Sequence, residues 1–352
     1  MSADICQKTS KNRMLWIDSL KAIAVSWIFL THFIQSSFLN WGINFSWGTI
    51  GSKILYGISG KYAVSFFCVF LGYLAAQSKN KSIVDRIVHR YLQFCIPLLL
   101  VSSLQYVIYY FQNSVSKRDV FLIPSISFLF ESNMLCAQAW CISFFFSASV
   151  IIYLLNEKKH RILFMLFLSV LFLFYQRLWI SICLFGAIIY HVSQLSFFKN
   201  FIKQMSKNKL LFSALKICLL VVAYLIIRFP ENDTTYLLDG VSASIILLVC
   251  LYSPLIQKIL SFPSLLHKTG FISFEIFLLH PMFYCLTNNL IFSRIKYDPN
   301  SRLTFLFAFV FAYLTVWLFA YLMSKLLKSK YNKKIYSFVD QIIPNLSWLI
   351  VL

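Results

Sequence analysis

Long apolar segments alternate with short polar and basic stretches along nearly the whole chain. A transmembrane helix needs about 20 predominantly apolar residues, so the pattern predicts an all-α polytopic integral membrane protein with about ten transmembrane helices. Segments 162–176 and 178–192 are short and meet at the polar pair Gln176-Arg177, which indicates either a tight hairpin or one broken element. The ten predicted segments are 14–37, 54–77, 92–112, 134–156, 162–176, 178–192, 210–228, 240–257, 270–292 and 303–326.

The composition excludes several classes of protein. Of 352 residues, 59% are hydrophobic and only 12% are charged, whereas about a quarter of the residues in a soluble protein are charged. A soluble enzyme, a disordered chain and a disulfide-rich secreted module are therefore excluded. The nine cysteines lie mostly inside apolar segments and show no CxxC spacing, so the sequence predicts small buried side chains and no metal site.

Basic residues give the chain a net charge of +20, and their distribution predicts its orientation. They are scattered in short clusters between apolar segments, which argues against binding to nucleic acid. With ten helices and a cytoplasmic N-terminus, 22 basic residues fall on the cytoplasmic side and nine on the other side. This bias predicts that both termini are cytoplasmic. The chain then divides into an N-terminal cytoplasmic segment (1–12), a transmembrane domain (13–328) and a cytoplasmic or interfacial tail (329–352).

Two acids, two histidines and one lysine lie deep inside the predicted transmembrane helices, where an ionisable group costs about 2.5 to 3.5 kcal/mol and is usually functional or paired. Lys21 and His32 are eleven residues apart, which is three helical turns plus about 20°. They therefore share a face and lie about 16 Å apart along the helix axis. Asp18 lies one turn before Lys21. Glu275 and His280 differ by about 140° around their helix, so the sequence predicts that they face different surroundings.

Simpler interpretations of these residues stay open. His32 can bond to a neighbouring backbone group, Lys21 can extend its ammonium group to the membrane surface, and Asp18 can serve only as the ion-pair partner of Lys21. Arg86 and Arg90, just before the third apolar segment, fit either ordinary cytoplasmic charge or a binding site for a phosphate group. The motifs GxGxxG, GxxxxGK[ST], HExxH and GxSxG do not occur, so a nucleotide cradle, a zinc protease and a hydrolase elbow have no support.

The first helix contains a recognisable order of residues. Arg13 precedes an Asp-x-Leu-Lys step formed by Asp18 and Lys21, and His32 follows after ten further residues. This order resembles the opening of the membrane-bound acyltransferase-3 family. Further landmarks resemble those of the family and occur in the same order: Phe66–Leu74, Arg86–Arg90 with Pro97, Trp140, and Ser273–Pro281.

The resemblance implies transfer of an acyl group, usually acetyl, to a hydroxyl of a cell-surface glycan or a lipid-linked saccharide. Within the family the chain is similar to small cell-envelope or exopolysaccharide O-acetyltransferases. Acetyl-CoA or another acyl-CoA is then a co-substrate, and no permanently bound cofactor is expected. The implied location is the inner (cytoplasmic) membrane, in contact with membrane lipids. A homodimer is among the assemblies that the sequence allows.

The resemblance also implies roles for individual residues. His32 is expected to be the general base, because neutral imidazole near pH 7 suits that task. Arg86 and Arg90, with help from Arg13, are expected to hold the phosphates of the acyl donor. Lys21 steadies the donor or pairs with an acid, and Glu275 is the second catalytic candidate because it can orient an imidazole. The expected supporting residues are Asp18, Trp140, Ser273 and His280.

The alternative function is that of a secondary transporter, or a flippase for a polysaccharide precursor. Charges inside the membrane and a strong basic bias occur in such proteins as well. Transporters more often show inverted repeats and helices broken by Gly or Pro at matching places in two halves, and the sequence shows neither. The sequence therefore favours the acyltransferase.

Overall fold

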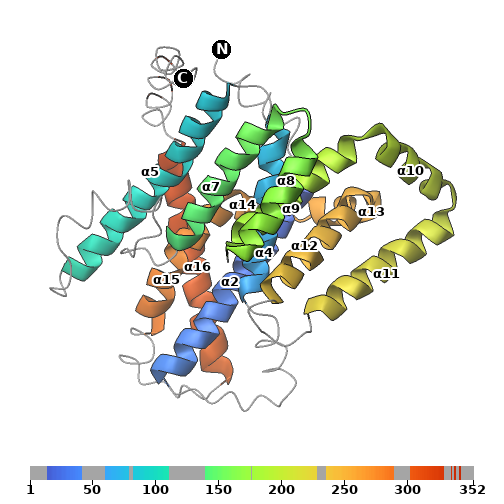
Figure 1. Ribbon diagram of the computed structural model, residues 1–352. Coiled ribbons are helices and arrows are strands. Elements are labelled where there is room, and N and C mark those ends of the chain that lie inside the picture. The colour runs from blue at the N-terminus through green and yellow to red at the C-terminus, as the bar shows by residue number, and fades with distance from the viewer. Residues whose placement is uncertain are drawn as a thin grey trace, which may run out of the picture.

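The computed structural model describes residues 14–41, 60–78, 82–110, 139–175, 177–227, 235–288 and 302–328, with the single residues 334, 337 and 341. Helices make up these ranges almost entirely, and no strand occurs in them (Figure 1). The helices are α2 (Leu15–Trp41), α4 (Gly60–Gln77), α5 (Ile83–Tyr110), α7 (Ala139–Asn156), α8 (Arg161–Phe174), α9 (Leu178–Gln194), α10 (Ser196–Lys207), α11 (Lys209–Ile227), α12 (Thr235–Leu251), α13 (Pro254–Ser261), α14 (Ser264–Phe271), α15 (Ser273–Asn288) and α16 (Arg302–Leu327).

The predicted all-α class is confirmed for the described residues, and each of the ten predicted apolar segments overlaps at least one of these helices. Four helices, α2, α5, α11 and α16, are long and apolar enough to cross a membrane. Two bent pairs, α9 with α10 and α12 with α13, bring the number to six when each pair counts as one span. The helices α4, α7, α8 and α15 are apolar but shorter. The protein is thus a multi-pass membrane protein, while ten spans and cytoplasmic termini stay predictions.

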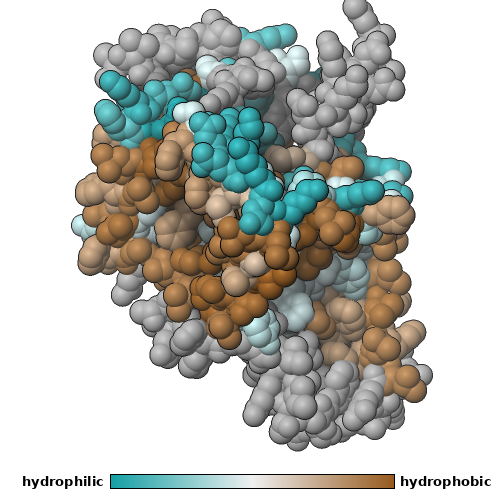
Figure 2. All heavy atoms as spheres, turned by 90° about the vertical axis from the view of Figure 1, so that its right-hand side faces the viewer, coloured by the Kyte–Doolittle hydropathy of each residue, from teal (hydrophilic) through white to brown (hydrophobic). Residues whose placement is uncertain are grey.

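Hydrophilic and hydrophobic residues occupy different parts of the molecular surface. Figure 2 shows hydrophilic residues gathered in a band towards one end, next to a broad hydrophobic surface. Helix α11 lies at the side of the molecule away from α5 (Figure 1), and most of its large apolar side chains are exposed. Exposed apolar surface of this extent is expected where a protein faces lipid.

The basic stretch that follows the sixth apolar segment has a helical structure that the sequence analysis does not predict. Segments 162–176 and 178–192 form the separate helices α8 and α9, which pack against each other as a hairpin. The basic stretch that follows is itself a helix, α10, bent by 76° from α9. Lys199, Lys203 and Lys207 recur every four residues on it, so they share one face of this amphipathic helix.

The segment predicted at 240–257 is not one straight helix. Helix α12 ends at Leu251, and α13 begins at Pro254 with a bend of 95°. A proline in the first helical position is favourable, but its ring prevents the preceding helix from continuing through it. The hydropathy pattern alone does not predict this break between α12 and α13.

Helix α4 packs against four others, α2, α7, α9 and α12. Its contact with α9 is very close, because a Cβ atom at Gly72 would overlap the carbonyl group of Cys183, and one at Gly186 would overlap that of Val69. Small residues at such crossings let helix backbones approach in membranes. On the other side of α4, helix α2 packs against α14, α15 and α16, and the candidate site lies in this region.

Candidate active site

The first turns of α2 contain an ion pair between a buried carboxylate and a half-buried lysine. Oδ1 of Asp18 lies 2.7 Å from Nζ of Lys21, one turn later. A carboxylate in the first turn of a helix also interacts favourably with the helix dipole. Gly270 of α14 packs on this turn, and a Cβ atom there would overlap the backbone carbonyl of Asp18. The glycine therefore allows α14 to lie directly against the start of α2.

A cavity of about 510 Å³ lies beside this pair, and we call it the first cavity. It brings together four predicted site residues: Lys21 from α2, Arg90 from α5, and Ser273 and Glu275 from α15. Lys328 also lines it, and most of the remaining wall consists of Phe and Leu side chains. The cavity therefore combines polar groups from four distant parts of the chain with an apolar wall.

The first cavity carries more positive than negative charge. Lys21, Arg90 and Lys328 line it, against the single carboxylate of Glu275. The charges of Lys328 and Lys21 both act on Glu275. Lys21 already pairs with Asp18, so Arg90 and Lys328 face the single carboxylate of Glu275 in a partly enclosed space, and the cavity suits a negatively charged ligand.

The two arginines predicted to bind the donor follow a well-defined helix start. Ser82 and Asp85 form a reciprocal cap: the Ser82 hydroxyl accepts the amide of Asp85 at 3.1 Å, and Oδ2 of Asp85 accepts the amide of Ser82 at 3.3 Å. This cap fixes where α5 begins and places Arg86 and Arg90 one turn apart. Their surroundings are nevertheless different.

Arg90 has neutral hydrogen-bond partners. Its Nε donates to the hydroxyl of Ser149 at 3.2 Å, and one terminal nitrogen donates to Oε1 of Gln93 at 3.0 Å. The guanidinium lies 4.8 Å from the centroid of the Phe94 ring. These contacts orient the group without neutralising it, so its charge is available to a ligand in the first cavity.

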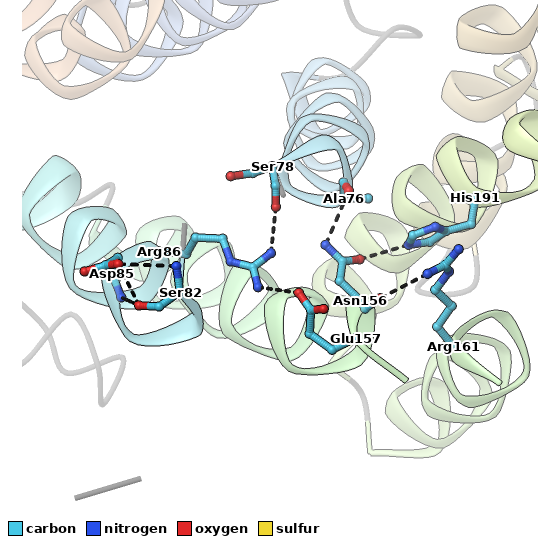
Figure 3. Close-up of polar contacts among 9 residues, drawn as sticks. All are labelled: Ala76, Ser78, Ser82, Asp85, Arg86, Asn156, Glu157, Arg161 and His191. Atoms are coloured by element: carbon cyan, nitrogen blue, oxygen red, sulfur yellow. Dashed lines mark hydrogen bonds and ion pairs between the residues drawn. The ribbon is translucent and has the colours of Figure 1, made fainter. Parts of the chain in front are cut away.

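Arg86 is buried and paired with a carboxylate, and it does not line the first cavity. One terminal nitrogen donates to Oε1 of Glu157 at 2.8 Å, and the other donates to the backbone carbonyl of Ser78 at 2.6 Å (Figure 3). The guanidinium also lies over the ring of Tyr153. The geometry gives Arg86 a place in holding α4, α5 and the end of α7 together, separate from the cavity.

Asn156 extends this arrangement to α9. Its side-chain amide donates to the carbonyl of Ala76 at 3.3 Å, and its side-chain oxygen accepts from Nε2 of His191 at 2.9 Å (Figure 3). Arg161 donates to the backbone carbonyl of Asn156 at 3.1 Å. We call Ser78, Arg86, Asn156, Glu157, Arg161 and His191 the buried polar cluster.

His32 and His280 form a stacked pair, which we call the histidine pair. Their ring centroids lie 5.2 Å apart, with 27° between the ring planes. Nδ1 of His32 lies 3.2 Å from Oε1 of Gln35, one turn further along α2. Because an amide oxygen only accepts, this bond places the proton of a neutral His32 on Nδ1 and the lone pair on Nε2. His32 is thus held in a tautomer that can take a proton at Nε2.

The orientation of His280 depends on the residue that follows it. Pro281 has no amide hydrogen, so it cannot donate to the carbonyl of Phe277, four residues earlier in α15. Nδ1 of His280 donates instead to the carbonyl oxygen of Phe277, at 2.7 Å. Pro281 thus leaves the carbonyl of Phe277 without its usual helical donor, and the imidazole of His280 donates to that carbonyl.

A protein family described as an acyltransferase domain matches residues 14–322 of this chain. The chain belongs to the acyltransferase-3 family. It is therefore an enzyme that transfers acyl groups other than aminoacyl groups. The searches of curated proteins and of solved structures give no match.

The remaining predicted residues of this acyltransferase lie in different places. Ser273 donates to the carbonyl of Gly270 at 2.9 Å and so fastens the start of α15 to α14 at the wall of the first cavity. Trp140 belongs to the first turn of α7. Arg13 lies outside the described residues. His280 lies in the histidine pair and not in the first cavity, as expected from its angular offset from Glu275.

Three residues of the site in this acyltransferase were not predicted from the sequence. Gln35 was identifiable as a polar residue one helical turn after His32. Gln93 stands in the same relation to Arg90. Lys328 was counted only as cytoplasmic charge, because no local pattern shows that the end of α16 reaches the first cavity.

Proposed function

We propose that this acyltransferase moves an acyl group, usually acetyl, from acyl-CoA to a hydroxyl of a cell-surface glycan or lipid-linked saccharide in the inner membrane. The observation that carries the proposal is the first cavity, where Lys21, Arg90 and Lys328 gather in a chain of the acyltransferase-3 family. CoA bears several phosphate charges, and cations in a partly enclosed cavity attract such a ligand. The three cations are therefore the donor-binding groups of the proposal.

The position of the basic stretches supports a cytoplasmic donor side. The start of α5, helix α10 and the end of α16 lie towards the same end of the molecule (Figure 1). Lysine and arginine are frequent at these places in the sequence, and such stretches face the cytoplasm. We propose ten spans with both termini on that side, which puts the first cavity near the side from which acyl-CoA arrives.

We propose His32 as the general base. Its Nε2 takes the proton of the acceptor hydroxyl while the hydroxyl oxygen forms the new ester bond to the acyl carbon. The bond between that carbon and the CoA sulfur breaks, and CoA leaves as a thiolate that is then protonated. The bond of Nδ1 to Gln35 supports this role, because it keeps the lone pair on Nε2.

The donor-binding cations and the base lie at different depths. Lys21 precedes His32 by about 16 Å along α2, and the pantetheine arm of CoA is long and thin. Aromatic rings connect the two places: Phe67 lines the first cavity, its ring lies 6.3 Å from that of Phe277, and Phe277 lies 5.8 Å from His280. We propose that the acyl arm follows this line while the phosphates stay at the cations.

Glu275 has a supporting place in this proposal. The charges of Lys328 and Lys21 act on its carboxylate, so it limits their mutual repulsion when no donor is bound. That Glu275 orients an imidazole stays a prediction; its place beside the lysines of the first cavity supports the charge-balancing role proposed here.

The test uses the full chain in nanodiscs with radiolabelled acetyl-CoA, together with the acetyl content of the surface glycan in cells with and without the protein. We expect release of free CoA thiol, label on a saccharide hydroxyl, and loss of both in a normally expressed H32A variant. Movement of a lipid-linked saccharide across the bilayer without acyl transfer would overturn the proposal in favour of the transporter or flippase.

A further inference from the structure

We propose that the donor site continues into a second cavity, which binds the 3′-phosphate end of the acyl-CoA nucleotide, while the first cavity takes the pyrophosphate, the pantetheine arm and the acyl group. The inference rests on the proposed function and adds a phosphate subsite to it. This subsite uses Lys268 and Lys325, which the sequence analysis counted only as cytoplasmic charge.

The second cavity has a volume of about 620 Å³ and lies between the start of α2, helix α14 and the end of α16. Lys268, Lys325 and Lys328 line it together with His267 and the carboxylate of Asp18. That carboxylate already pairs with Lys21 at 2.7 Å. The three lysines therefore leave the second cavity with an excess of positive charge, which suits phosphate groups.

Aromatic rings and a hydroxyl hold two of the lysines of the second cavity in place. Nζ of Lys325 lies 4.8 Å from the centroid of the Tyr321 ring. Nζ of Lys328 lies 3.0 Å from the centroid of the Phe271 ring and donates to the hydroxyl of Ser324 at 2.6 Å. Contacts with aromatic faces and a hydroxyl orient these cations without cancelling their charge.

The two cavities are neighbours that share part of their wall. Phe271 and Lys328 line both of them. The ion pair at the start of α2 forms a second link, because Asp18 lines the second cavity and Lys21 lines the first. A ligand that has a polyanionic end and a long arm can therefore occupy both cavities by passing this shared wall.

The difference between the two linings decides which part of the donor each cavity takes. Phe and Leu make up half of the residues that line the first cavity, and they fit a thin, weakly polar arm with an acyl group. Three lysines and a histidine from two short stretches line the second cavity. The negative charge of CoA is confined to its nucleotide half, so the pyrophosphate lies where the cations of the first cavity meet the shared wall, and the 3′-phosphate beyond it belongs in the second cavity.

The experiment compares two donors on the full-length protein in phosphatidylcholine nanodiscs: acetyl-CoA and S-acetyl-pantetheine, which lacks the nucleotide. K268Q and K325Q are each expected to raise the KM for acetyl-CoA about fivefold with kcat nearly unchanged, as for loss of one charged contact at an accessible site. Both variants should use S-acetyl-pantetheine as the parent does. K258Q, in the last turn of α13 and outside both cavities, is the matched control.

Equal losses with both donors, or no loss with acetyl-CoA, would overturn the phosphate subsite. An effect of K268Q and K325Q that appears only when phosphatidylglycerol is added to the nanodiscs would also overturn it, because the cavity would then hold a lipid headgroup. If the parent transfers acyl groups from neither donor, the proposed function fails. Equilibrium binding of CoA then decides the subsite: about fivefold weaker binding to K325Q supports it, and equal binding refutes it.

Discussion

The buried polar cluster and the first cavity use the same kinds of side chain in opposite ways. Arg86 and Arg90 stand one turn apart on α5, yet Arg86 meets a carboxylate and a carbonyl, whereas Arg90 meets a hydroxyl and an amide. Only Arg90 lines the cavity. The charge of Arg86 is satisfied inside the protein, while that of Arg90 is oriented and left for a ligand.

The histidines repeat the same contrast. His191 is buried and donates to Asn156, which in turn donates to the end of α4, so the imidazole is one member of a structural network. His32 is half-buried and stacks on His280. Residue type alone does not separate a structural group from a functional one; the partners around it do. Buried groups with fixed partners stabilise a fold, whereas an oriented group whose partners do not neutralise it stays able to react.

The largest expected effect comes from His32→Ala. Acyl transfer should fall about 10² to 10⁴-fold, because general-base help is typically of that size. The amount of inserted protein should stay close to that of the parent, since a half-buried ring is removed. Turnover with labelled acetyl-CoA, normalised to the amount of protein in the membrane, measures this change.

His191→Ala is the matched control for His32. It should lower the amount and thermal stability of the protein, because it leaves the oxygen of Asn156 without this donor. Turnover per folded molecule should hardly change. A turnover in His32→Ala equal to that of the parent would contradict the assignment of the base and remove the contrast between the two histidines.

Arg86→Ala should act on stability. Removal of one member of a buried, hydrogen-bonded ion pair costs about 3 to 5 kcal/mol, and the exposed position of Glu157 puts the expected loss near the lower limit. The KM for acyl-CoA should stay unchanged. Thermal unfolding in detergent and donor kinetics on the folded fraction provide the two measurements.

Arg86→Lys sharpens this prediction. An ammonium group cannot reproduce the forked contacts of the guanidinium with Glu157 and Ser78, so lysine should restore little stability. Normal stability of Arg86→Ala together with a raised KM for acyl-CoA would return Arg86 to the donor site that the sequence first indicated.

Arg90→Ala should give the reverse result. The KM for acyl-CoA should rise about tenfold, which corresponds to loss of one charged contact of about 1.4 kcal/mol. Thermal stability should change little, because the partners of Arg90 are neutral and Gln93 is exposed. Steady-state kinetics with varied donor measures the effect, and Arg90→Lys should recover part of it; a donor KM equal to that of the parent would reduce Arg90 to structural charge.

The smallest expected effect is that of Pro281→Ala. Alanine supplies an amide that competes with the imidazole of His280 for the carbonyl of Phe277, so the orientation of His280 is held less firmly. Loss of one such hydrogen bond, worth about 1 kcal/mol, should lower kcat about fivefold. The donor KM should be unaffected, and a changed tautomer of His280 should be visible by ¹⁵N NMR of labelled histidine. Parental kcat with a changed tautomer would remove His280 from the positioning of the base.

Much of the fold and part of the site were predictable because they depend on neighbours in the sequence. Hydropathy marks the ten apolar segments, and helical periodicity places Asp18 one turn from Lys21, where the structure has their ion pair. The angular offset between Glu275 and His280 likewise predicts that they face different surroundings, as they do. These properties depend on positions within one helix, and one sequence contains all of them.

Contacts between distant helices were decided by the tertiary structure alone. Arg86 and Glu157 are 71 residues apart in sequence, and local pattern does not show that α5 begins where α7 ends. The stacking of His32 on His280 and the arrival of Lys328 at the first cavity depend in the same way on which helices pack together. That choice is made by close backbone contacts such as those at Gly72 and Gly270. The sequence by itself determines which residues are costly to place in a membrane, and only packing decides whether each one is neutralised by a partner or left beside a cavity, because the interaction energy of two charges depends on their distance in space.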